Sequence, residues 1–265
     1  MNLPKASGYL TLKGLICLPL QMDATCHTVG PRLYFSSSEE MSIRGKAIMS
    51  GSSDPSGSDT GTRDQVFFGL PNVYVDKGAH VAHFFQGDQE RVNVLAPFLR
   101  AGLESGDQCV LVAEASASAI IADSLKELGV DVEAALASGQ LLIADGSSSV
   151  DEMSSLFEAV ISRSKSAGRE VIRVGGDMTW ALGKLPTAEK LLEWEAFYDK
   201  YVGPRANFVA LCQYDQSRFG GNAIMCALQT HPLSIIGNIV QENPFYRDPS
   251  EVLQELSQNG ASSRS

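Results

Sequence analysis

The fold is decided by VAHFFQGDQERVNVLAPFLRAGLESGDQCVLVAEAS, residues 81–116, in which two short apolar runs flank a glycine-containing loop and an amphipathic segment. This order predicts strand, loop, helix and strand, the layout of a nucleotide-binding unit. A phosphate-binding loop also needs a lysine to neutralise phosphate and a hydroxyl to hold magnesium. Here only Gly87 remains of that motif, and Asp88 and Glu90 would repel phosphate. The stretch therefore predicts the frame of a nucleotide-binding fold without ATP hydrolysis.

The same alternation of apolar runs and amphipathic segments continues along the chain. Strands are predicted at residues 80–85, 108–113, 140–145, 170–176, 207–214 and 233–240. Helices are predicted at residues 88–105, 116–128, 150–167, 187–202 and 217–230. Repeated strand and helix at this spacing indicates right-handed crossovers. We therefore expect a single α/β domain with a mostly parallel sheet and helices on both faces.

Three segments of different character are expected. Residues 41–65 are rich in Gly, Ser and Asp and cannot bury enough apolar surface to become ordered, so residues 1–70 are predicted to be a flexible or mis-annotated leader. Met41 or Met49 could be the true start, in which case residues 1–40 are not translated. Residues 71–249 form the folded domain, and residues 250–265 are predicted to be a frayed polar tail.

Charge and cysteine content exclude several classes of protein. The first 70 residues hold six basic and six acidic groups, so the remainder holds 15 basic against 25 acidic groups and carries the whole net charge of −10. This field disfavours direct nucleic-acid binding. No apolar run reaches the roughly 18 residues of a membrane span, and the N-terminal run at 14–20 is short and broken by Pro19. Five scattered cysteines indicate reduced thiols in a cytoplasm, and no metal site or cofactor is expected.

A series of motifs resembles a known family. The frame is similar to RecA-like ATPases, especially their KaiC-type branch, with the phosphate loop degenerate. Taken together, residues 78–248 resemble the MEDS sensory domains of methanogen and methylotroph proteins. The resemblance is carried by His80, APFLRAGLESGDQCVLVA (96–113), GVDVEAALASGQLLI (129–143), RVGGDMTWAL (173–182), LLEWEAFYD (191–199), LCQYD (211–215) and HPLSIIGNIVQENPFY (231–246).

The resemblance implies signal transduction by ligand binding. MEDS domains are thought to sense small organic ligands beside output modules such as DNA-binding or histidine-kinase domains. Neither a helix-turn-helix nor kinase motifs occur in residues 1–77, and Phe85 and His83 depart from the tyrosine and aliphatic residue common in the family. The implied output is therefore a separate signalling protein: a histidine kinase, an anti-sigma system or a transcription regulator.

The candidate ligand site is placed by a rule of α/β sheets. Ligands bind beyond the carboxyl ends of the strands, near the switch in strand order. Aromatic side chains with a few acids suit a small neutral or cationic ligand. In the motif at 175–180, Asp177 could instead only cap the next helix. The residues selected are Phe85, Gln86, Gly87, Glu114, Asp145, Gly176, Asp177, Trp180, Tyr214 and Asp215.

A second set of residues is assigned structural roles. Glu195 lies on an otherwise apolar helix stripe, and we expect it to form a buried ion pair with Arg173. His80 and His83 point to opposite faces of their strand, and His80 stands at the wrong strand end for the ligand site. Cys212 is expected to be an inert buried thiol, since no histidine is close to it in the sequence. Turn or motif roles are assigned to His231, Asn243, Pro244 and Tyr246.

Three functions remain open at this point. The leading one is a non-catalytic sensory domain for a small organic ligand. The second is a nucleotide-binding module that does not hydrolyse and holds the base against Trp180 or Phe85. The third is a ligand-free interaction protein that modulates a kinase or an anti-sigma system.

Overall fold

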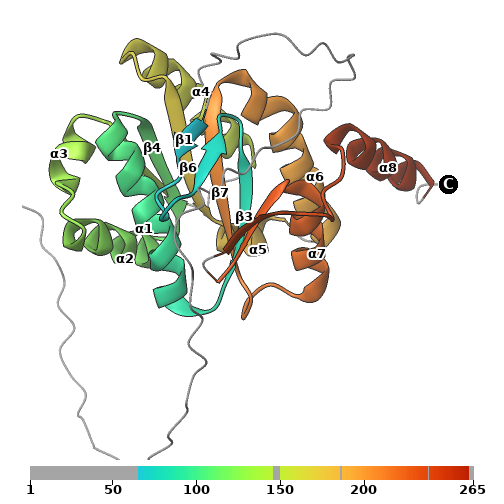
Figure 1. Ribbon diagram of the computed structural model, residues 1–265. Coiled ribbons are helices and arrows are strands. Elements are labelled where there is room, and N and C mark those ends of the chain that lie inside the picture. The colour runs from blue at the N-terminus through green and yellow to red at the C-terminus, as the bar shows by residue number, and fades with distance from the viewer. Residues whose placement is uncertain (1–64, 146–149, 186, 238, 263–265) are drawn as a thin grey trace, which may run out of the picture. The chain divides into compact units, whose positions relative to one another are not determined.

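The structure, a computed structural model, describes residues 65–145, 150–185, 187–237 and 239–262; the predictions for residues 1–64 lie outside this part. A central sheet has the strand order β5-β4-β6-β7-β3-β8-β9 (Figure 1). All neighbouring strands are parallel except β8 and β9. The strands are β3 (His80–Phe85), β4 (Gln108–Ala113), β5 (Leu141–Asp145), β6 (Val171–Asp177), β7 (Asn207–Asp215), β8 (Leu233–Ile236) and β9 (Ile239–Glu242). A separate hairpin pairs β1 (Gln65–Phe67) with β2 (Tyr74–Asp76).

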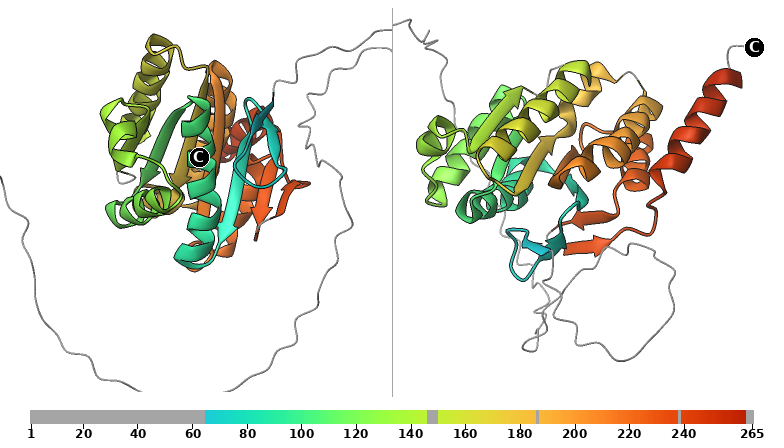
Figure 2. Two further views of the ribbon diagram at one scale, coloured as in Figure 1. Left: turned by 60° about the vertical axis from the view of Figure 1, so that its left-hand side comes forward. Right: turned by 90° about the horizontal axis from the view of Figure 1, so that it is seen from above.

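Helices cover both faces of the sheet (Figure 2). One face carries α1 (Gly87–Ser105), α2 (Ala115–Glu127), α3 (Val132–Ala137) and the β1–β2 hairpin. The other face carries α4 (Val150–Ser166), α5 (Ala181–Lys184), α6 (Ala188–Phe197) and α7 (Gly221–Thr230). Short helical turns are the 3-10 segments Met178–Trp180 and Gly203–Arg205 and the π-helix Tyr198–Val202. The last helix, α8 (Pro249–Ser262), packs on α6.

Alternation along the strands divides the core into two clusters. In β3, Val81 packs with the α1 face, whereas Ala82 and Phe84 pack with the α6 face. In β6, Ile172 and Val174 likewise face α6. Because successive side chains in a strand point to opposite faces, this parity fixes which helix each buried polar side chain can reach.

The predicted fold class is confirmed, and three local predictions differ from the structure. The single strand predicted at 233–240 is a hairpin of β8 and β9, which turns at Gly237 with φ +61°. Such a left-handed backbone is one that glycine adopts readily, and the sequence pattern alone did not show the turn. Strand β1 lies inside the predicted leader, and α8, with its buried Val252, lies inside the predicted tail. The relation to RecA-like proteins stays a prediction.

Candidate functional site

The loop before α1 explains the missing phosphate chemistry. Helix N-termini attract anions because their first N–H groups lack partners within the helix. Here the Glu90 carboxylate accepts the backbone N–H of Gln86 at 2.7 Å, and Asp88 adds a second acid to the first turn. Gly87 has φ +75° and lies exposed at this start. The helix thus carries its own anion where a nucleotide would place phosphate.

Asp177, at the end of β6, is committed to contacts within the protein. Its Oδ1 accepts the Thr179 N–H at 3.1 Å and caps the following turn. Its Oδ2 lies 3.2 Å from Arg91 Nη1, and Arg91 also pairs with Asp88 and lies over the Phe85 ring at 5.1 Å. The capping role considered for Asp177 is therefore confirmed, and its charge is matched by Arg91, which the sequence analysis did not single out.

Three other predicted ligand residues at this edge also make contacts within the described part of the protein. Asp215 caps the turn after β7 by accepting the Ser217 N–H and hydroxyl. Glu114 lies 3.7 Å from Arg218, and both are partly exposed. Asp145 is exposed at the end of β5, and the Tyr214 hydroxyl points instead to Glu195.

A small cavity lies between the sheet and α6. Its volume is about 30 Å³, and two of the predicted ligand residues, Gly176 and Trp180, line it. A space of this size admits roughly two water molecules. The rest of the lining is largely apolar and consists of Val112, Phe157, Val174, Met178, Trp194, Glu195, Tyr198, Ala210 and Cys212. The aromatic residues of 191–199 were the sequence signal for this wall, but their orientation depends on how α6 packs.

Polar groups at the cavity wall are few and distinctive. The Tyr214 hydroxyl donates to Glu195 Oε1 at 2.6 Å, and Glu195 is 1% exposed. Tyr198 begins a π-helix, an irregularity that occurs frequently at functional sites. Its buried hydroxyl has no hydrogen-bond partner among the described residues. The cavity therefore combines an apolar wall with a carboxyl group, a thiol and an unsatisfied hydroxyl.

The ion pair expected between Glu195 and Arg173 is wrong. Arg173 points to the α1 face, because it lies between Ile172 and Val174, which face α6. Its Nε donates to Asp107 Oδ2 at 2.7 Å. Glu195 instead lies near His80, with Glu195 Oε2 at 3.5 Å from His80 Nε2.

No histidine is close to Cys212 in the sequence, but the fold brings one next to it. Strands β3 and β7 are neighbours, with Ala82 opposite Cys212, and the Cys212 Sγ lies 3.4 Å from His80 Nε2. The His80 ring contacts the His231 ring, with 3.9 Å between centroids. Burial raises the pKa of the Cys212 thiol and that of Glu195, and it lowers the pKa of His231. The sequence did not reveal this cluster of His80, Glu195, Cys212 and His231, because its members lie far apart along the chain.

The turn after β9 has the predicted determinants. The Asn243 side chain donates to the carbonyls of Leu228 and His231 and accepts the Phe245 N–H, while Pro244 follows it. The Tyr246 hydroxyl donates to Asp199 Oδ2 at 2.7 Å. This turn therefore holds the segment beyond β9 against the end of α7 and the π-helix.

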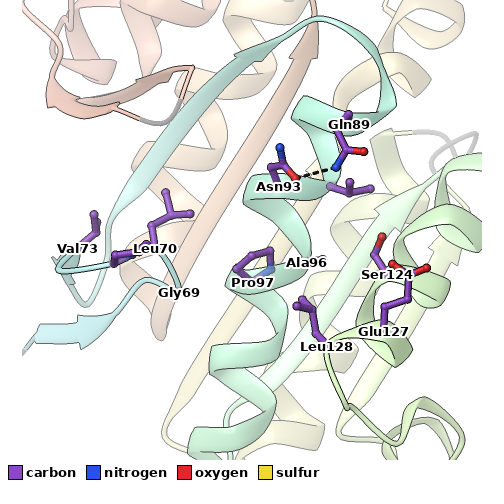
Figure 3. Close-up of a pocket in the computed structure, with 12 residues that line it drawn as sticks. Gly69, Leu70, Val73, Gln89, Asn93, Ala96, Pro97, Ser124, Glu127 and Leu128 are labelled. Atoms are coloured by element: carbon purple, nitrogen blue, oxygen red, sulfur yellow. Dashed lines mark hydrogen bonds between the residues drawn. The ribbon is translucent and has the colours of Figure 1, made fainter. Parts of the chain in front are cut away.

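A larger groove of about 600 Å³ lies on the α1 face (Figure 3). The loop of the β1–β2 hairpin, α1 and α2 form it, and Leu70, Pro97 and Leu128 supply apolar surface. Gln89 Nε2 donates to Asn93 Oδ1 at 2.8 Å, so these two amides partly satisfy one another (Figure 3). The groove is open, and none of the predicted ligand residues lines it. We therefore regard the cavity beside α6, which Gly176 and Trp180 line, as the better candidate site.

His83 provides a test of the buried polar network on the α1 face. Its Nδ1 accepts from Gln213 Nε2 at 2.9 Å, and Gln213 also donates to the Arg91 carbonyl. Burial lowers the pKa of His83 to about 4. The unfolded chain therefore binds more protons than the folded one between pH 6.5 and about 4, and stability falls as the pH falls through this window.

We expect His83→Gln to flatten this pH dependence. Across the window the wild type should lose about 2–3 kcal/mol of unfolding free energy that the variant does not lose. Urea unfolding of both proteins at pH 7 and pH 4.5 measures the difference. Equal losses in the two proteins would contradict a neutral, buried His83.

The fold defines the class of this protein: a single α/β domain with a mostly parallel sheet flanked by helices, in which the helix after the first sheet strand begins with acidic residues. Residues 79–232 match the family described as MEDS, the MEthanogen/methylotroph, DcmR Sensory domain, and the chain belongs to this family. It is 31% identical over 163 residues to the transcriptional repressor DcmR of Methylorubrum extorquens (strain DSM 6343 / CIP 106787 / DM4). The match covers 62% of this chain and 60% of the repressor, so it spans less than two thirds of that relative's length.

Family membership gives the domain a sensory role in signalling. The expected resemblance to MEDS domains is thereby confirmed. In the part of the chain that the structure describes, no helix has both the length and the apolar character required to cross a membrane.

Proposed function

We propose that this protein is a non-catalytic sensory domain that binds a small organic ligand in the cavity beside α6. The observation that carries the proposal is the small, largely apolar space of about 30 Å³ bounded by Trp180, Trp194 and Phe157. Apolar enclosure with a few polar groups is the usual character of small-molecule sites. The cavity would have to widen to take a ligand of a few heavy atoms, and one polar group of that ligand would meet the unsatisfied Tyr198 hydroxyl.

The output of the domain would go to a separate partner. The relative DcmR is a transcriptional repressor, which supports a transcription regulator or another signalling protein as that partner. A histidine kinase or an anti-sigma system would serve the same role. Cys109, Cys212 and Cys226 are free thiols, which supports a cytoplasmic location as part of this proposal.

The nucleotide-binding alternative has less support. Trp180 is 4% exposed and Phe85 is fully buried, so neither ring offers a free face to a base. The acidic start of α1 further disfavours phosphate. The interaction-protein alternative is favoured by one observation, the exposed apolar side chains Ile236, Ile239 and Phe245 on and after the β8–β9 hairpin.

A glycine in the cavity wall allows a direct test of the proposed site. A Cβ at Gly176 would meet only Met178 Sδ at 3.6 Å and the Leu211 carbonyl oxygen at 4.0 Å. Gly176→Ala should therefore fold normally while filling part of the cavity. Ligand-linked thermal stabilisation should first be screened with short-chain alcohols, aldehydes, ketones and halogenated hydrocarbons, and with nucleotides with and without magnesium.

We expect a compound that stabilises the wild type to bind Gly176→Ala at least about tenfold more weakly, since 1.4 kcal/mol of lost contact has this effect. Gly183→Ala is the matched control, because that glycine is exposed on α5 and a Cβ there meets nothing within 4 Å. Equal binding to Gly176→Ala and the wild type would place the ligand elsewhere. Stabilisation by nucleotides alone would favour the second function, and no stabilisation by any compound would favour the interaction protein.

A further inference from the structure

Four side chains from distant parts of the sequence converge next to the cavity. They are His80 at the start of β3, Glu195 on α6, Cys212 on β7 and His231 directly after α7. One nitrogen, oxygen or sulfur atom from each lies within 4.8 Å of the corresponding atoms of the other three. Two imidazoles, a carboxylate and a thiol are the donor types that bind zinc.

The spacing of these atoms fits a shared metal ion. His80 Nε2 lies 3.4 Å from Cys212 Sγ and 3.5 Å from Glu195 Oε2, and His231 Nε2 lies 4.0 Å from the same oxygen. Ligands at zinc distances of about 2.0–2.3 Å in a tetrahedron are roughly 3.3–3.8 Å apart. Only small shifts of the side chains would bring the four atoms to these separations.

Neighbouring groups orient the ligands as they do in metal sites. The Nδ1 of His231 donates to the Ala227 carbonyl at 2.7 Å, which leaves Nε2 as the lone-pair nitrogen. This Nε2 is buried and has no hydrogen-bond partner among the described residues. On His80, Nδ1 lies 3.5 Å from Asp199 Oδ1, an arrangement resembling the carboxylate–histidine pairs that support metal ligands.

The charges of the four side chains also favour binding of a cation. Glu195 is buried, and in the described part of the chain no lysine or arginine forms an ion pair with it. Bound as a carboxylate and a thiolate, Glu195 and Cys212 would need a positive counter-charge at this largely buried position. A dication would supply that charge, and a surface pocket of about 210 Å³ that includes His80 and Asp199 offers an entry path.

We propose that His80, Glu195, Cys212 and His231 hold one divalent transition-metal ion, which the donor set identifies as Zn²⁺. A thiolate and two imidazoles exclude the hard cations Mg²⁺ and Ca²⁺, which take oxygen ligands. Glu195 and Cys212 also line the cavity, so the ion forms part of its wall. The metal site stands on its own geometry and does not depend on the proposed organic ligand.

The test uses the full chain, purified under reducing conditions, stripped with a chelator and titrated with Co²⁺. We expect one equivalent of Co²⁺ to bind with a thiolate-to-cobalt charge-transfer band, and Zn²⁺ to displace it. Cys212→Ser should abolish this band, and His231→Gln should weaken zinc binding at least about tenfold. Cys226→Ser is the matched control, because Cys226 is a partly buried thiol outside the cluster, and it should keep the band.

Several results would overturn the proposal. If a variant fails to fold, the titration of the wild type still tests the proposal. Absence of a stoichiometric thiolate–cobalt band in the wild type excludes the site. A band that survives in Cys212→Ser or disappears in Cys226→Ser would assign the metal to other thiols. Because no organic compound is added, this experiment is independent of ligand binding, and Gly176→Ala should retain the metal even where it loses the ligand.

Discussion

Arg173→Ala should lower the free energy of unfolding by about 3–5 kcal/mol, because it leaves a buried carboxylate without its partner. The Arg173 side chain is 1% exposed and pairs with Asp107. Its guanidinium also donates to the carbonyls of Phe67, Phe68 and Phe98. One side chain thus joins β6, the hairpin, α1 and the start of β4.

The position of the Arg173 side chain beneath α1 depends on Gly102. A Cβ at Gly102 would lie 2.4 Å from Arg173 Cδ, so α1 can cover the arginine only where it has no side chain. Urea unfolding measures the loss, and Arg100→Ala is the control. Arg100 forms an exposed pair with Glu104 one turn away, so its removal should cost less than about 0.5 kcal/mol. Comparable losses in the two variants would show that Arg173 does not hold these elements together.

Trp180→Ala should also cost about 3–5 kcal/mol and should change which compounds bind. Trp180 packs edge-on against Trp194, with 6.1 Å between ring centroids, and it lines the cavity. Removing the indole enlarges the cavity, whose volume in the wild type is about 30 Å³. The proposed ligand should lose affinity, while larger apolar compounds should gain it, since apolar cavities made by truncation bind small aromatic molecules.

Urea unfolding measures the loss of stability, and a thermal-shift series of compounds of increasing size measures the change in ligand preference. Phe197→Ala is the matched control, because Phe197 also stacks on Trp194 but is 39% exposed and does not line the cavity. It should leave the preference for ligand size unchanged. An unchanged preference in Trp180→Ala as well would argue that ligands bind outside this cavity.

The strands of the core could be predicted from the sequence because burial on both faces makes them continuous apolar runs. The predicted bounds 80–85 and 108–113 are those of β3 and β4. The hairpin of β8 and β9 was missed because Gly237 interrupts a run whose composition is otherwise that of one strand. Local composition does not reveal where such a run reverses direction.

The candidate site was less predictable, since it depends on packing between segments far apart in the sequence. The rule of carboxyl strand ends selected Gly176 and Trp180, which line the cavity, but also acids that cap turns, such as Asp215. The proximity of His80 and Cys212 follows from the pairing of β3 with β7. Side chains alternate along β6, so Arg173 points to the opposite face of the sheet from Ile172 and Val174. Only the structure shows which helices cover each face.

The acidic start of α1 has a consequence for what the protein can report. Because the Glu90 carboxylate already accepts the Gln86 N–H and Asp88 stands beside it, nucleoside triphosphates meet repulsion at the place where related frames would bind them. We therefore expect changes in cellular nucleotide levels to have little effect at this edge of the sheet. Under the proposed sensory function, a domain with an acidic turn at this position would report its own stimulus without also responding to nucleotide levels.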